Sequence, residues 1–571
     1  MSAQTTPSDI HEVDWLVFGA GAGGMAAALA GALQGLQVLV CEKSDQVGGA
    51  TATSAGTLWI PENKASIAAG FSGDSKDDAR EYLDSLIGTA EPGRTLREVY
   101  LQEGPDIIEW FEQRSDVQFM ACGEHPDYLA KKGAAIAGRA IIPKPFDGRL
   151  LGRNFFRVRA PIPEFMVLGG MMVGKLDIPA LVHRFKSIAN FWYASRLLFR
   201  YVTDRLRYTR GTRLMLGNAL VARLYSSLLA CKVPVLFNAE LDSLITDDGR
   251  VTGAEVLVNG KRQRILARRG VVLATGGFAN NASLRHAFMP NSAPDSMAVP
   301  ENQGKGIAAA MDIGALTQPE KHGGGVFWTP VSRTGSGQWA GLFPHLVMDR
   351  AKPGLIAVNS AGKRFVNEAV SYHHFVEAMF ESNKTVPTIP AWLVCENSFV
   401  NKYGLGAIHP GTKNLVPFER KGWVVQAETL QELAAKMNVN CQGLTDTVRR
   451  HNGFAATGID EDFEKGTTEL NRFNGDSAHG PNACIGAIES GPYCAMAVWP
   501  AEIACSTGLE TDVNARVLNQ RGQPMVGLYA CGNDLASIMQ GTYPGPGTTL
   551  GPALVFGYKA AHHAANQCQQ N

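Results

Sequence analysis

A glycine-rich turn near the start of the chain constrains the possible folds more than any other feature. The apolar run at residues 14–18 leads directly into the turn at residues 19–24, of sequence GAGAGG, and an alanine-rich segment of helical character follows. A second apolar run, residues 38–41, then ends at Glu42. Strand, glycine turn, helix and strand in this order are typical of a Rossmann-like α/β domain that binds a dinucleotide.

The spacing gives each glycine of the turn a task. Gly19 makes the tight turn, Gly21 lets a pyrophosphate approach the backbone, and Gly24 allows the helix to pack closely on the strand. Glu42 follows about 20 residues later, where an acid accepts hydrogen bonds from a ribose diol. This unit predicts a dinucleotide site and leaves NAD and FAD open.

Three further segments favour FAD. Residues 48–56 form a second Gly/Ser/Thr-rich stretch and resemble the loop that lines the flavin half of the cofactor in large FAD enzymes. Strands ending at residues 274–277 (ATGG) and 531–534 (CGND) resemble two later strands of such flavoproteins. The predicted FAD-binding residues are Gly19, Gly21, Gly23, Gly24, Glu42, Lys43, Gly48, Gly49, Ala50, Thr51, Ser54, Ala55, Gly56, Thr275, Gly276, Gly532, Asn533, Thr549 and Leu550.

The length of 571 residues predicts two large interleaved domains. We expect residues 1–284 to form the first part of the FAD-binding domain, with a helical insertion at about 165–214. Residues 285–500 are expected to form an inserted α+β catalytic domain, and residues 501–571 return to the cofactor.

Charge and cysteine usage exclude several classes of partner. Lys plus Arg and Asp plus Glu number 53 each, so no electrostatic argument for nucleic acid exists, and a small, weakly charged substrate is expected. The ten cysteines form no CxxC pair and no Cys/His cluster at metal spacing, which predicts no metal and a reducing compartment. No leader or membrane-spanning run is visible, so we expect a cytoplasmic protein and leave membrane apposition open.

The insertion at residues 165–214 is rich in arginine and aromatic residues. Only Asp177 and Asp204 offset the positive charge of its arginines. Such a helix either lies on an anionic membrane surface with its aromatic residues in the interface or forms a flap whose apolar face packs on the domain. We expect the flap.

A second glycine-rich loop, residues 541–557, lies close to the C-terminus. Its sequence around Tyr543 is TYPGPG, in which the prolines stiffen the turn and the glycines permit close approach to a ligand. Pro552 suits the first position of a helix whose N-terminus favours negative charge.

These motifs together resemble one family. The matching segments are the first unit through Gly49, residues 57–63, 358–368 and 450–454, and above all residues 542–547. Over most of its length the chain resembles the FAD-dependent 3-ketosteroid Δ1-dehydrogenases, within the succinate dehydrogenase and fumarate reductase flavoprotein class.

The resemblance implies a desaturase of 3-oxosteroids or similar cyclic ketones that acts in steroid degradation. The Tyr543 hydroxyl and the Gly547 amide would bind the C3 carbonyl oxygen, a base would take the C2 proton, and hydride would pass from C1 to FAD. Donors aimed at a developing enolate oxygen lower the barrier by about 3 kcal/mol each. A separate electron acceptor would then reoxidise the FAD.

The family's base is a tyrosine four residues past the Glu of an Asn-Glu motif, which identifies Tyr372 after Glu368. A second alignment instead places Phe375 at that position. His373 or His374 either assists a tyrosine base or is structural. Tyr128 matches a tyrosine that supports the base, and simple packing is its alternative role.

Two other functions stay open. A fumarate-reductase-like enzyme would need cationic clamps for a carboxylate, for which Arg333 and Arg364 are candidates, but the predicted catalytic region is rich in aromatic residues such as Phe327 and Trp328. A flavin-binding scaffold without catalysis is the other alternative, and the altered sequence after Tyr372 is its support.

Overall fold

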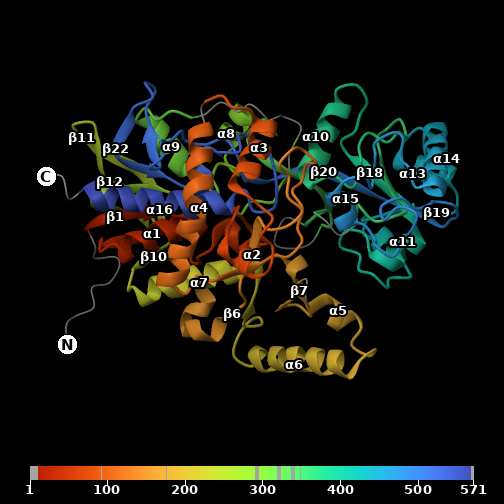
Figure 1. Cartoon of the computed structure of the whole chain (residues 1–571), viewed down its shortest axis with the longest axis horizontal. Helices are drawn as coiled ribbons and strands as arrows, with labels where there is room; N and C mark the ends of the chain where they lie inside the picture. The colour runs from red at the N-terminus through yellow and green to blue at the C-terminus, as the bar shows by residue number, and fades with distance from the viewer. Residues whose placement is uncertain are drawn as a thin grey trace.

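The computed structural model describes residues 11–91, 93–174, 177–289, 293, 295–317, 323–335, 341–346 and 349–567. Two large sheets dominate it (Figure 1). One carries the first glycine turn and lies on the left of the view, and the other, on the right, is built from the middle of the chain.

The first sheet has eight strands in the order β10-β2-β1-β13-β12-β11, and β22 and β21 continue from β13. Strand β1 runs parallel to β2 and β13, as the predicted unit requires. The sheet strands are β1 Glu12–Phe18, β2 Val38–Glu42, β10 Val235–Phe237, β11 Ala239–Asp247, β12 Arg250–Val258, β13 Lys261–Leu273, β21 Arg516–Leu518 and β22 Pro524–Ala530. Strands β11 to β13 form an antiparallel meander that leads into the ATGG segment.

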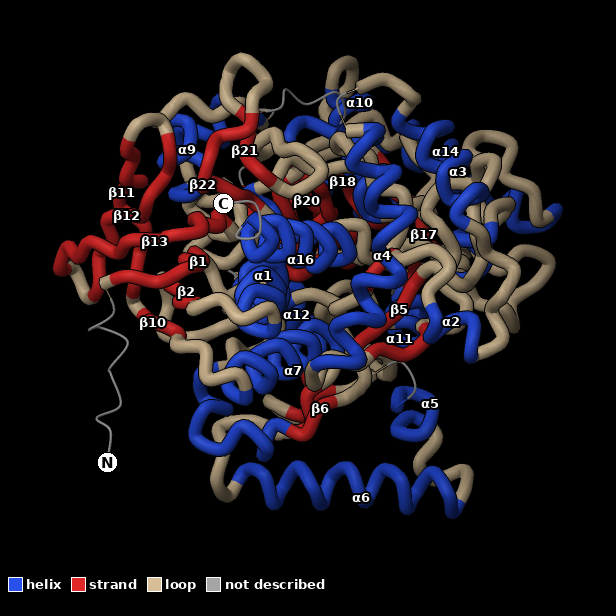
Figure 2. Tube along the Cα trace, turned by 60° about the vertical axis from the view of Figure 1, so that its left-hand side comes forward, coloured by secondary structure: helices blue, strands red, loops and turns tan. Residues whose placement is uncertain are grey.

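Helices pack closely against this sheet (Figure 2). Helix α1 contacts both α7 and α16, and α16 also contacts α4. Their bounds are α1 Ala22–Leu33, α4 Arg94–Arg114, α7 Leu216–Ala230 and α16 Leu550–Asn566. Because α16 begins at Leu550, Pro552 is its third residue and not its first, but it still lies in the first turn, where backbone N–H groups have no partner within the helix.

The second sheet has seven strands, with the order β16-β15-β20-β18-β17 and with β14 and β19 also paired to β20. All of its pairs are antiparallel except that of β14 with β20. The strands are β14 Asp295–Ser296, β15 Val326–Arg333, β16 Leu342–Pro344, β17 Leu355–Val358, β18 Ala391–Glu396, β19 Val425–Ala427 and β20 Tyr493–Cys505. Strand β20 is therefore the centre of this sheet.

Shorter elements complete the described chain. The remaining helices are α2 Lys64–Ala68, α3 Lys76–Ile87, α5 Asp177–Val182, α6 Ile188–Arg205, α8 Ala282–Phe288, α9 Lys305–Asp312, α10 Tyr372–Asn383, α11 Asn397–Tyr403, α12 Val416–Arg420, α13 Leu430–Met437, α14 Cys441–Thr457 and α15 Glu469–Asn474. The remaining strands are β3 Leu58–Trp59, β4 Phe119–Ala121, β5 Ala140–Pro143, β6 Phe146–Asp147, β7 Met166–Val167, β8 Met171–Met172 and β9 Arg213–Leu214.

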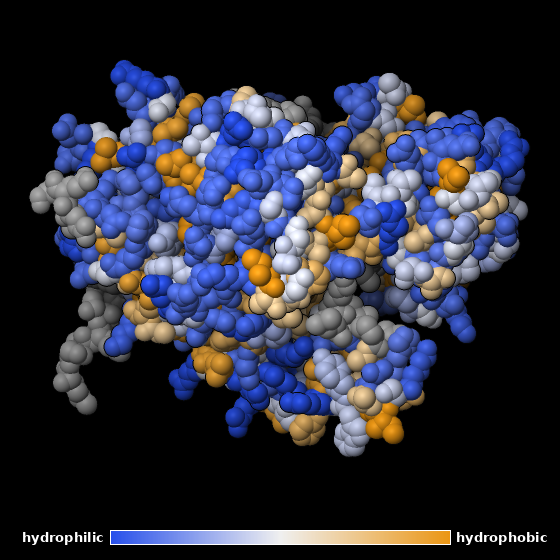
Figure 3. Space-filling view, viewed as in Figure 1, coloured by the Kyte–Doolittle hydropathy of each residue, from blue (hydrophilic) through white to orange (hydrophobic). Residues whose placement is uncertain are grey.

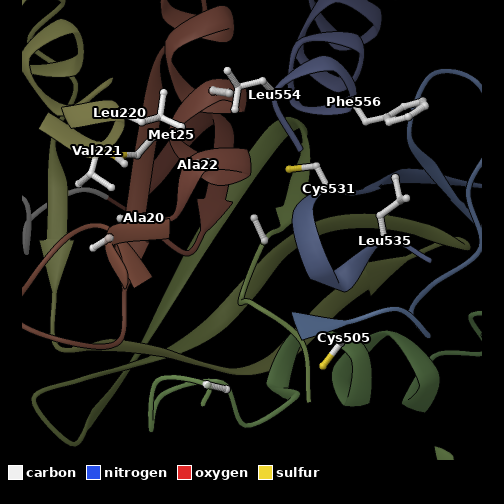
Figure 4. Close-up of a cluster of buried hydrophobic side chains, with 14 of the residues drawn as sticks. Ala20, Ala22, Met25, Leu220, Val221, Cys505, Cys531, Leu535, Leu554 and Phe556 are labelled. Atoms are coloured by element: carbon white, nitrogen blue, oxygen red, sulfur yellow. The ribbon is translucent and has the colours of Figure 1, made fainter. Parts of the chain in front are cut away.

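The main core lies directly behind the glycine turn. Figure 4 shows side chains of α1, α7 and α16, including Met25, Val221 and Leu554, in one cluster near Ala20 and Ala22 of the turn. Because this cluster is buried and well packed, it holds the turn and the start of α1 in a fixed position.

The expectation that the apolar face of the 165–214 insertion packs on the domain is wrong for most of that face. Helix α6 lies apart from the body of the molecule at the bottom of Figure 1, and hydrophobic atoms are visible at this end in Figure 3. Trp192 and Phe199 are 68% and 73% exposed, while Tyr201 and Asp204 are the residues of α6 described as buried. Polar groups link the insertion to the segment before it, since Arg210 donates to the Val158 carbonyl oxygen at 3.1 Å and Arg200 pairs with Asp147 at 2.9 Å.

Candidate active site

A cavity of about 400 Å³ lies beside the glycine turn and is lined by residues that are far apart in the sequence, from Phe18 to Ala553. Of the predicted cofactor-binding residues, Gly24 and Gly48 lie outside its lining and the others belong to it. Gly24 packs against the backbone of the turn, where a Cβ atom would lie 1.9 Å from the Gly19 carbonyl oxygen. The Gly48 N–H donates to the carbonyl oxygen of Ala20, 2.8 Å away, so Gly48 fixes the turn through its backbone and does not face the cavity.

The glycines around the cavity differ in whether a side chain would fit. A Cβ atom on Gly19 would lie 2.1 Å from the Ala274 carbonyl oxygen, and one on Gly24 would lie 1.9 Å from that of Gly19. These two positions have no room for a side chain. In contrast, the nearest atom to a Cβ on Gly21 is 3.8 Å away, and a Cβ on Gly532 meets nothing within 4 Å. The open space beside Gly21 and Gly532 fits a dinucleotide such as FAD against bare backbone.

Glu42 ends β2 at the edge of the cavity. Its carboxylate accepts hydrogen bonds from the Ala20 N–H at 2.7 Å and the Ser44 N–H at 2.9 Å. Burial raises the pKa of Glu42, although these two hydrogen bonds lower it. The acid is therefore oriented by the turn itself and stands at the place expected for a ribose-binding group.

The structure adds residues that the sequence did not single out. Asp534 accepts hydrogen bonds from Thr275 and from the Gly277 N–H at 2.9 Å, and so joins the ends of the two later cofactor strands. Asp534 could have been found from the sequence, because it follows Asn533 directly in the CGND segment. Arg159 and Glu301 form a 2.9 Å ion pair in the cavity lining, and no local sequence pattern marks either of them.

Three tyrosines meet at the other end of the cavity. The Tyr372 hydroxyl lies 3.2 Å from that of Tyr128 and donates to that of Tyr543 at 3.0 Å. All three rings are buried and share a cluster with Phe327 and Leu470. Tyr128 comes from the loop between β4 and β5, Tyr372 is the first residue of α10, and Tyr543 lies just before α16. The structure thus brings together the tyrosines that the sequence identified.

The PGPG loop, residues 544–547, is held at both ends by hydrogen bonds. The Pro544 carbonyl oxygen accepts hydrogen bonds from the Tyr128 N–H at 2.8 Å and the Tyr82 hydroxyl at 2.7 Å. The Gly547 carbonyl oxygen accepts from the Trp59 N–H at 3.3 Å. Gly547 has a φ angle of 94°, which glycine adopts without steric cost. These contacts fix the Tyr543 hydroxyl and the Gly547 amide at the cavity.

The tyrosine hydroxyls differ in the charges around them. Burial raises the pKa of all three phenols above the usual value of 10. Tyr543 therefore keeps its proton at neutral pH and is a hydrogen-bond donor. For Tyr372, burial and Tyr128 raise the pKa, whereas the hydrogen bond with Tyr543 and the charge of Arg350 lower it. Tyr372 is the phenol whose environment includes a cation.

The two histidines after Tyr372 have structural partners. The His373 Nδ1 accepts from the Trp328 N–H at 3.2 Å, and its Nε2 lies 3.3 Å from a Glu377 carboxylate oxygen. The His374 Nδ1 lies 2.6 Å from the Ser371 hydroxyl oxygen, and burial lowers the pKa of His374 to about 4. Between the residues that the structure describes, no hydrogen bond joins either histidine to the tyrosine cluster.

Phe375, the alternative at the base position, points elsewhere. Its ring packs on Phe365 and lies 4.8 Å from the Arg350 guanidinium. Tyr372 lines the cavity, whereas Phe375 is not part of the described lining. The geometry therefore favours the alignment through Tyr372.

Comparisons with known proteins agree with this architecture. The model of the FAD binding domain family matches residues 14–550. The chain is 36% identical to 4-oxocyclohex-2-ene-1-carboxylate 5-dehydrogenase of Sinomonas cyclohexanicum, over 97% of this chain and 93% of that protein. It is 34% identical to 3-oxosteroid 1-dehydrogenase of Mycolicibacterium smegmatis, over 96% and 97% of the two chains.

A solved structure is similar over the whole length. It is a 3-ketosteroid delta1-dehydrogenase from Sterolibacterium denitrificans in complex with 1,4-androstadiene-3,17-dione. The TM-score is 0.89 at 36% sequence identity, and the match covers 98% of this chain and all of that chain.

Proposed function

Since this chain belongs to the FAD-dependent 3-ketosteroid Δ1-dehydrogenase family and is thus an oxidoreductase that binds FAD, we propose that its substrate is an uncharged fused-ring ketone such as a 3-oxosteroid. The reaction removes two hydrogens from C1 and C2, next to the C3 carbonyl group. An external acceptor would take up the two electrons that the substrate loses.

The apolar character of the cavity beside the three tyrosines carries this proposal. Leu346 and Ile503 line the cavity and pack against the tyrosines, and Ile503 also packs with three further apolar lining residues, Ile162, Phe165 and Met297. An apolar surface of this kind favours a ring system without charge.

The basic side chains of the lining lie at the Glu42 end. Lys43 lies 3.0 Å from Glu240, Lys305 lies 3.6 Å from the same carboxylate, and Arg159 pairs with Glu301. In the described lining no lysine or arginine remains for a substrate carboxylate beside the tyrosines. This arrangement supports a neutral ketone over a ring carboxylate of the kind named for the Sinomonas relative.

The carbonyl oxygen of the substrate would lie between the Tyr543 hydroxyl and the Gly547 N–H. Both groups donate hydrogen bonds, and they become stronger as negative charge develops on the oxygen. The neighbouring C–H bond is acidified, and the Tyr372 oxygen takes its proton. Tyr128, whose hydroxyl lies 3.2 Å from that of Tyr372, orients this oxygen.

The residues of the first unit would hold the cofactor. The backbone of Gly21 and the start of α1 suit the pyrophosphate, while Glu42 suits a ribose. FAD, when bound, accepts a hydride from the carbon next to the deprotonated one. The apolar lining excludes water from the carbon atoms that react.

Arg333 and Arg364, the two candidates to bind a substrate carboxylate in a fumarate-reductase-like enzyme, are both paired with other residues of the protein. Arg364 forms hydrogen bonds with Glu368 at 2.8 Å and with Asp460 at 2.7 Å, and all three side chains are buried. Arg333 pairs with Asp295 and stacks on Trp499 at 4.3 Å. Both guanidinium groups are occupied by the protein itself.

A direct substrate comparison tests the proposed function. The FAD-loaded protein with an artificial electron acceptor should oxidise androst-4-ene-3,17-dione, and 4-oxocyclohexanecarboxylate should react at least 100-fold more slowly in kcat/KM. Tyr225→Phe is the matched control, because Tyr225 is buried in α7, away from the cavity lining. A preference for the carboxylate, or for reduction of fumarate, would contradict the proposal.

We also infer that the exposed face of α6 binds an anionic membrane. Phe185, Trp192, Phe199 and Leu206 are between 68% and 81% exposed. Basic residues on the same segment, Arg184, Lys186, Arg196, Arg205 and Arg207, are exposed as well. Aromatic side chains with neighbouring positive charges suit the interface of an anionic bilayer. Among the described residues the structure holds no helix that could span a bilayer.

Liposome sedimentation tests this surface. The intact protein should sediment with anionic vesicles and remain in the supernatant with neutral ones, and the double variant Trp192→Ser, Phe199→Ser should lose the association. Ile67→Ser is the control, since Ile67 is 48% exposed on α2. If the intact protein stays in the supernatant with anionic vesicles, the inference is wrong.

A further inference from the structure

Arg350 is a buried arginine beside the tyrosine cluster. It is 3% exposed and lies between β16 and β17. Its guanidinium donates to four backbone carbonyl oxygens. The acceptors are those of His345 at 3.0 Å, Glu368 at 2.8 Å, Val370 at 3.1 Å and Leu346 at 3.1 Å.

These hydrogen bonds join two segments that build the active end of the cavity. Val370 lies two residues before Tyr372, and Leu346 lines the cavity. The guanidinium also lies 4.8 Å from the ring of Phe375, in the first turn of α10. Arg350 therefore ties the start of α10 to the cavity wall.

The carboxylates near Arg350 are engaged by other groups. The Asp349 carboxylate lies 2.6 Å from His345 Nδ1 and accepts from the Gly406 N–H at 3.0 Å. Glu368 pairs with Arg364 and with Lys465. In the part of the chain that the structure describes, no ion pair within 4.0 Å involves Arg350. Its positive charge is thus only partly balanced within the protein.

The charge of Arg350 is permanent at neutral pH. Burial lowers the pKa of Arg350 to about 10, while Asp349, Glu368 and Tyr372 raise it. The groups that face Tyr372 in turn are Tyr128, Tyr543 and Arg350, and the last is the cation among them. A tyrosine base requires a tyrosinate, whose negative charge is costly in a buried site unless a positive charge is near.

We propose that Arg350 is the positioning residue of the base: its buried cation stabilises the tyrosinate of Tyr372, and its hydrogen bonds to Glu368, Val370 and Leu346 fix where that phenol lies. This inference rests on the proposed function. The N-terminal position of Tyr372 in α10 acts in the same direction, because the helix dipole favours negative charge there.

Two substitutions separate the charge from the hydrogen bonds. In Arg350→Gln the positive charge is lost, so the rising limb of the kcat/KM profile against pH should move upward by about one pH unit or more. Below that limb, kcat/KM should fall about tenfold. Arg350→Lys keeps the positive charge but lacks the planar guanidinium and its fixed set of donors. The rising limb of this variant should therefore stay within a few tenths of a pH unit of the parent, while kcat falls.

The matched control is Arg210→Gln. Arg210 is also buried, has a pKa lowered by burial to about 10, donates to the Val158 carbonyl oxygen at 3.1 Å and stacks on Phe155. Its variant should leave the pH profile unchanged. Bound FAD and Tm are measured for each protein. If the rising limb of the kcat/KM profile does not shift in Arg350→Gln, the inference is overturned. If the glutamine variant does not fold, Arg350→Lys decides, and a shift of its limb by one pH unit overturns the inference.

A double-mutant cycle identifies the partner of Arg350. In a Tyr372→Phe background the tyrosinate no longer exists, so Arg350→Gln should cost less than threefold there, compared with about tenfold in the parent. Equal losses in both backgrounds would overturn the inference. Wild-type turnover of Tyr372→Phe would instead refute the base assigned under the proposed function, whereas a large loss in Tyr372→Phe with no shift in Arg350→Gln refutes only the role of Arg350.

Discussion

A methyl group at Gly547 probes the proposed carbonyl site directly. A Cβ atom at this position would lie 2.4 Å from the Thr57 carbonyl oxygen and 2.7 Å from the Leu58 carbonyl carbon. Both atoms belong to the backbone and cannot turn aside as a flexible side chain would. The φ angle of 94° is also one that residues with a Cβ atom rarely adopt. The loop in Gly547→Ala must therefore move.

The size of the effect follows from the required movement. Ordinary contact of a Cβ begins at 3.4 Å, so the backbone at Gly547 must shift by about 1 Å, and a misplacement of that size at a reacting centre costs on the order of 100-fold in rate. Loss of one donor to an oxyanion costs about 100- to 1,000-fold in kcat. We therefore expect kcat/KM of Gly547→Ala to fall at least about 100-fold, or about 2.7 kcal/mol.

The assay follows ketone-dependent reduction of an artificial acceptor, with activity expressed per bound FAD. Gly70→Ala is the control, since Gly70 has a φ angle of 91° but no atom within 4 Å of its Cβ position. That variant carries the backbone strain alone and should lose Tm without losing activity. Retention of kcat/KM within threefold of the parent in Gly547→Ala would refute the assigned role of this amide.

Three further predictions concern single side chains. Tyr543→Phe removes one donor to the carbonyl oxygen and should lower kcat about 100- to 1,000-fold; a loss below tenfold in steady-state assays contradicts this role. Tyr128→Phe removes one hydrogen bond to the base, worth about 1 kcal/mol, so kcat should fall roughly fivefold, and a loss as large as that of Tyr543→Phe would show a direct role. Burial raises the pKa of Glu502 from 4.5 to about 7, so the folded state loses stability relative to the unfolded state as pH rises through this window. Glu502→Gln should thus gain Tm over the parent at pH 8 but not at pH 4, and an equal difference at both pH values would refute this reasoning.

The cofactor half of the site was predictable because its signals are local. Gly19 and Gly24 are glycines since their own backbone neighbours leave no room for a Cβ atom, and such constraints are visible as spacing. The domain boundaries remain a prediction.

The catalytic end depended on segments far apart in the sequence. The motif intervals identified Tyr372 and Tyr543, but that their hydroxyls meet at 3.0 Å results from packing between α10 and the loop before α16. Arg350 carries no sequence signature, since its role depends on backbone carbonyls that any residue supplies. The prediction for the insertion was wrong for a related reason. The composition of α6 predicts an amphipathic helix, but it does not predict whether a neighbouring surface covers the apolar face of that helix.

The chain leaves the first sheet at Leu273 of β13, and the N–H of Phe278, five residues later, donates to the sulfur of Cys505 at the end of β20, 3.2 Å away. The entry and exit of the second sheet are thus neighbours, and a recombination event could replace the intervening segment without disturbing the strand order. Such a chimaera would keep Tyr128 and Tyr543 from one parent and receive Tyr372 with Arg350 from the other. In such an exchange the residues proposed to bind the ketone and the residue proposed to remove its proton would come from different parents, so ring specificity would change while the carbonyl-binding groups stay the same.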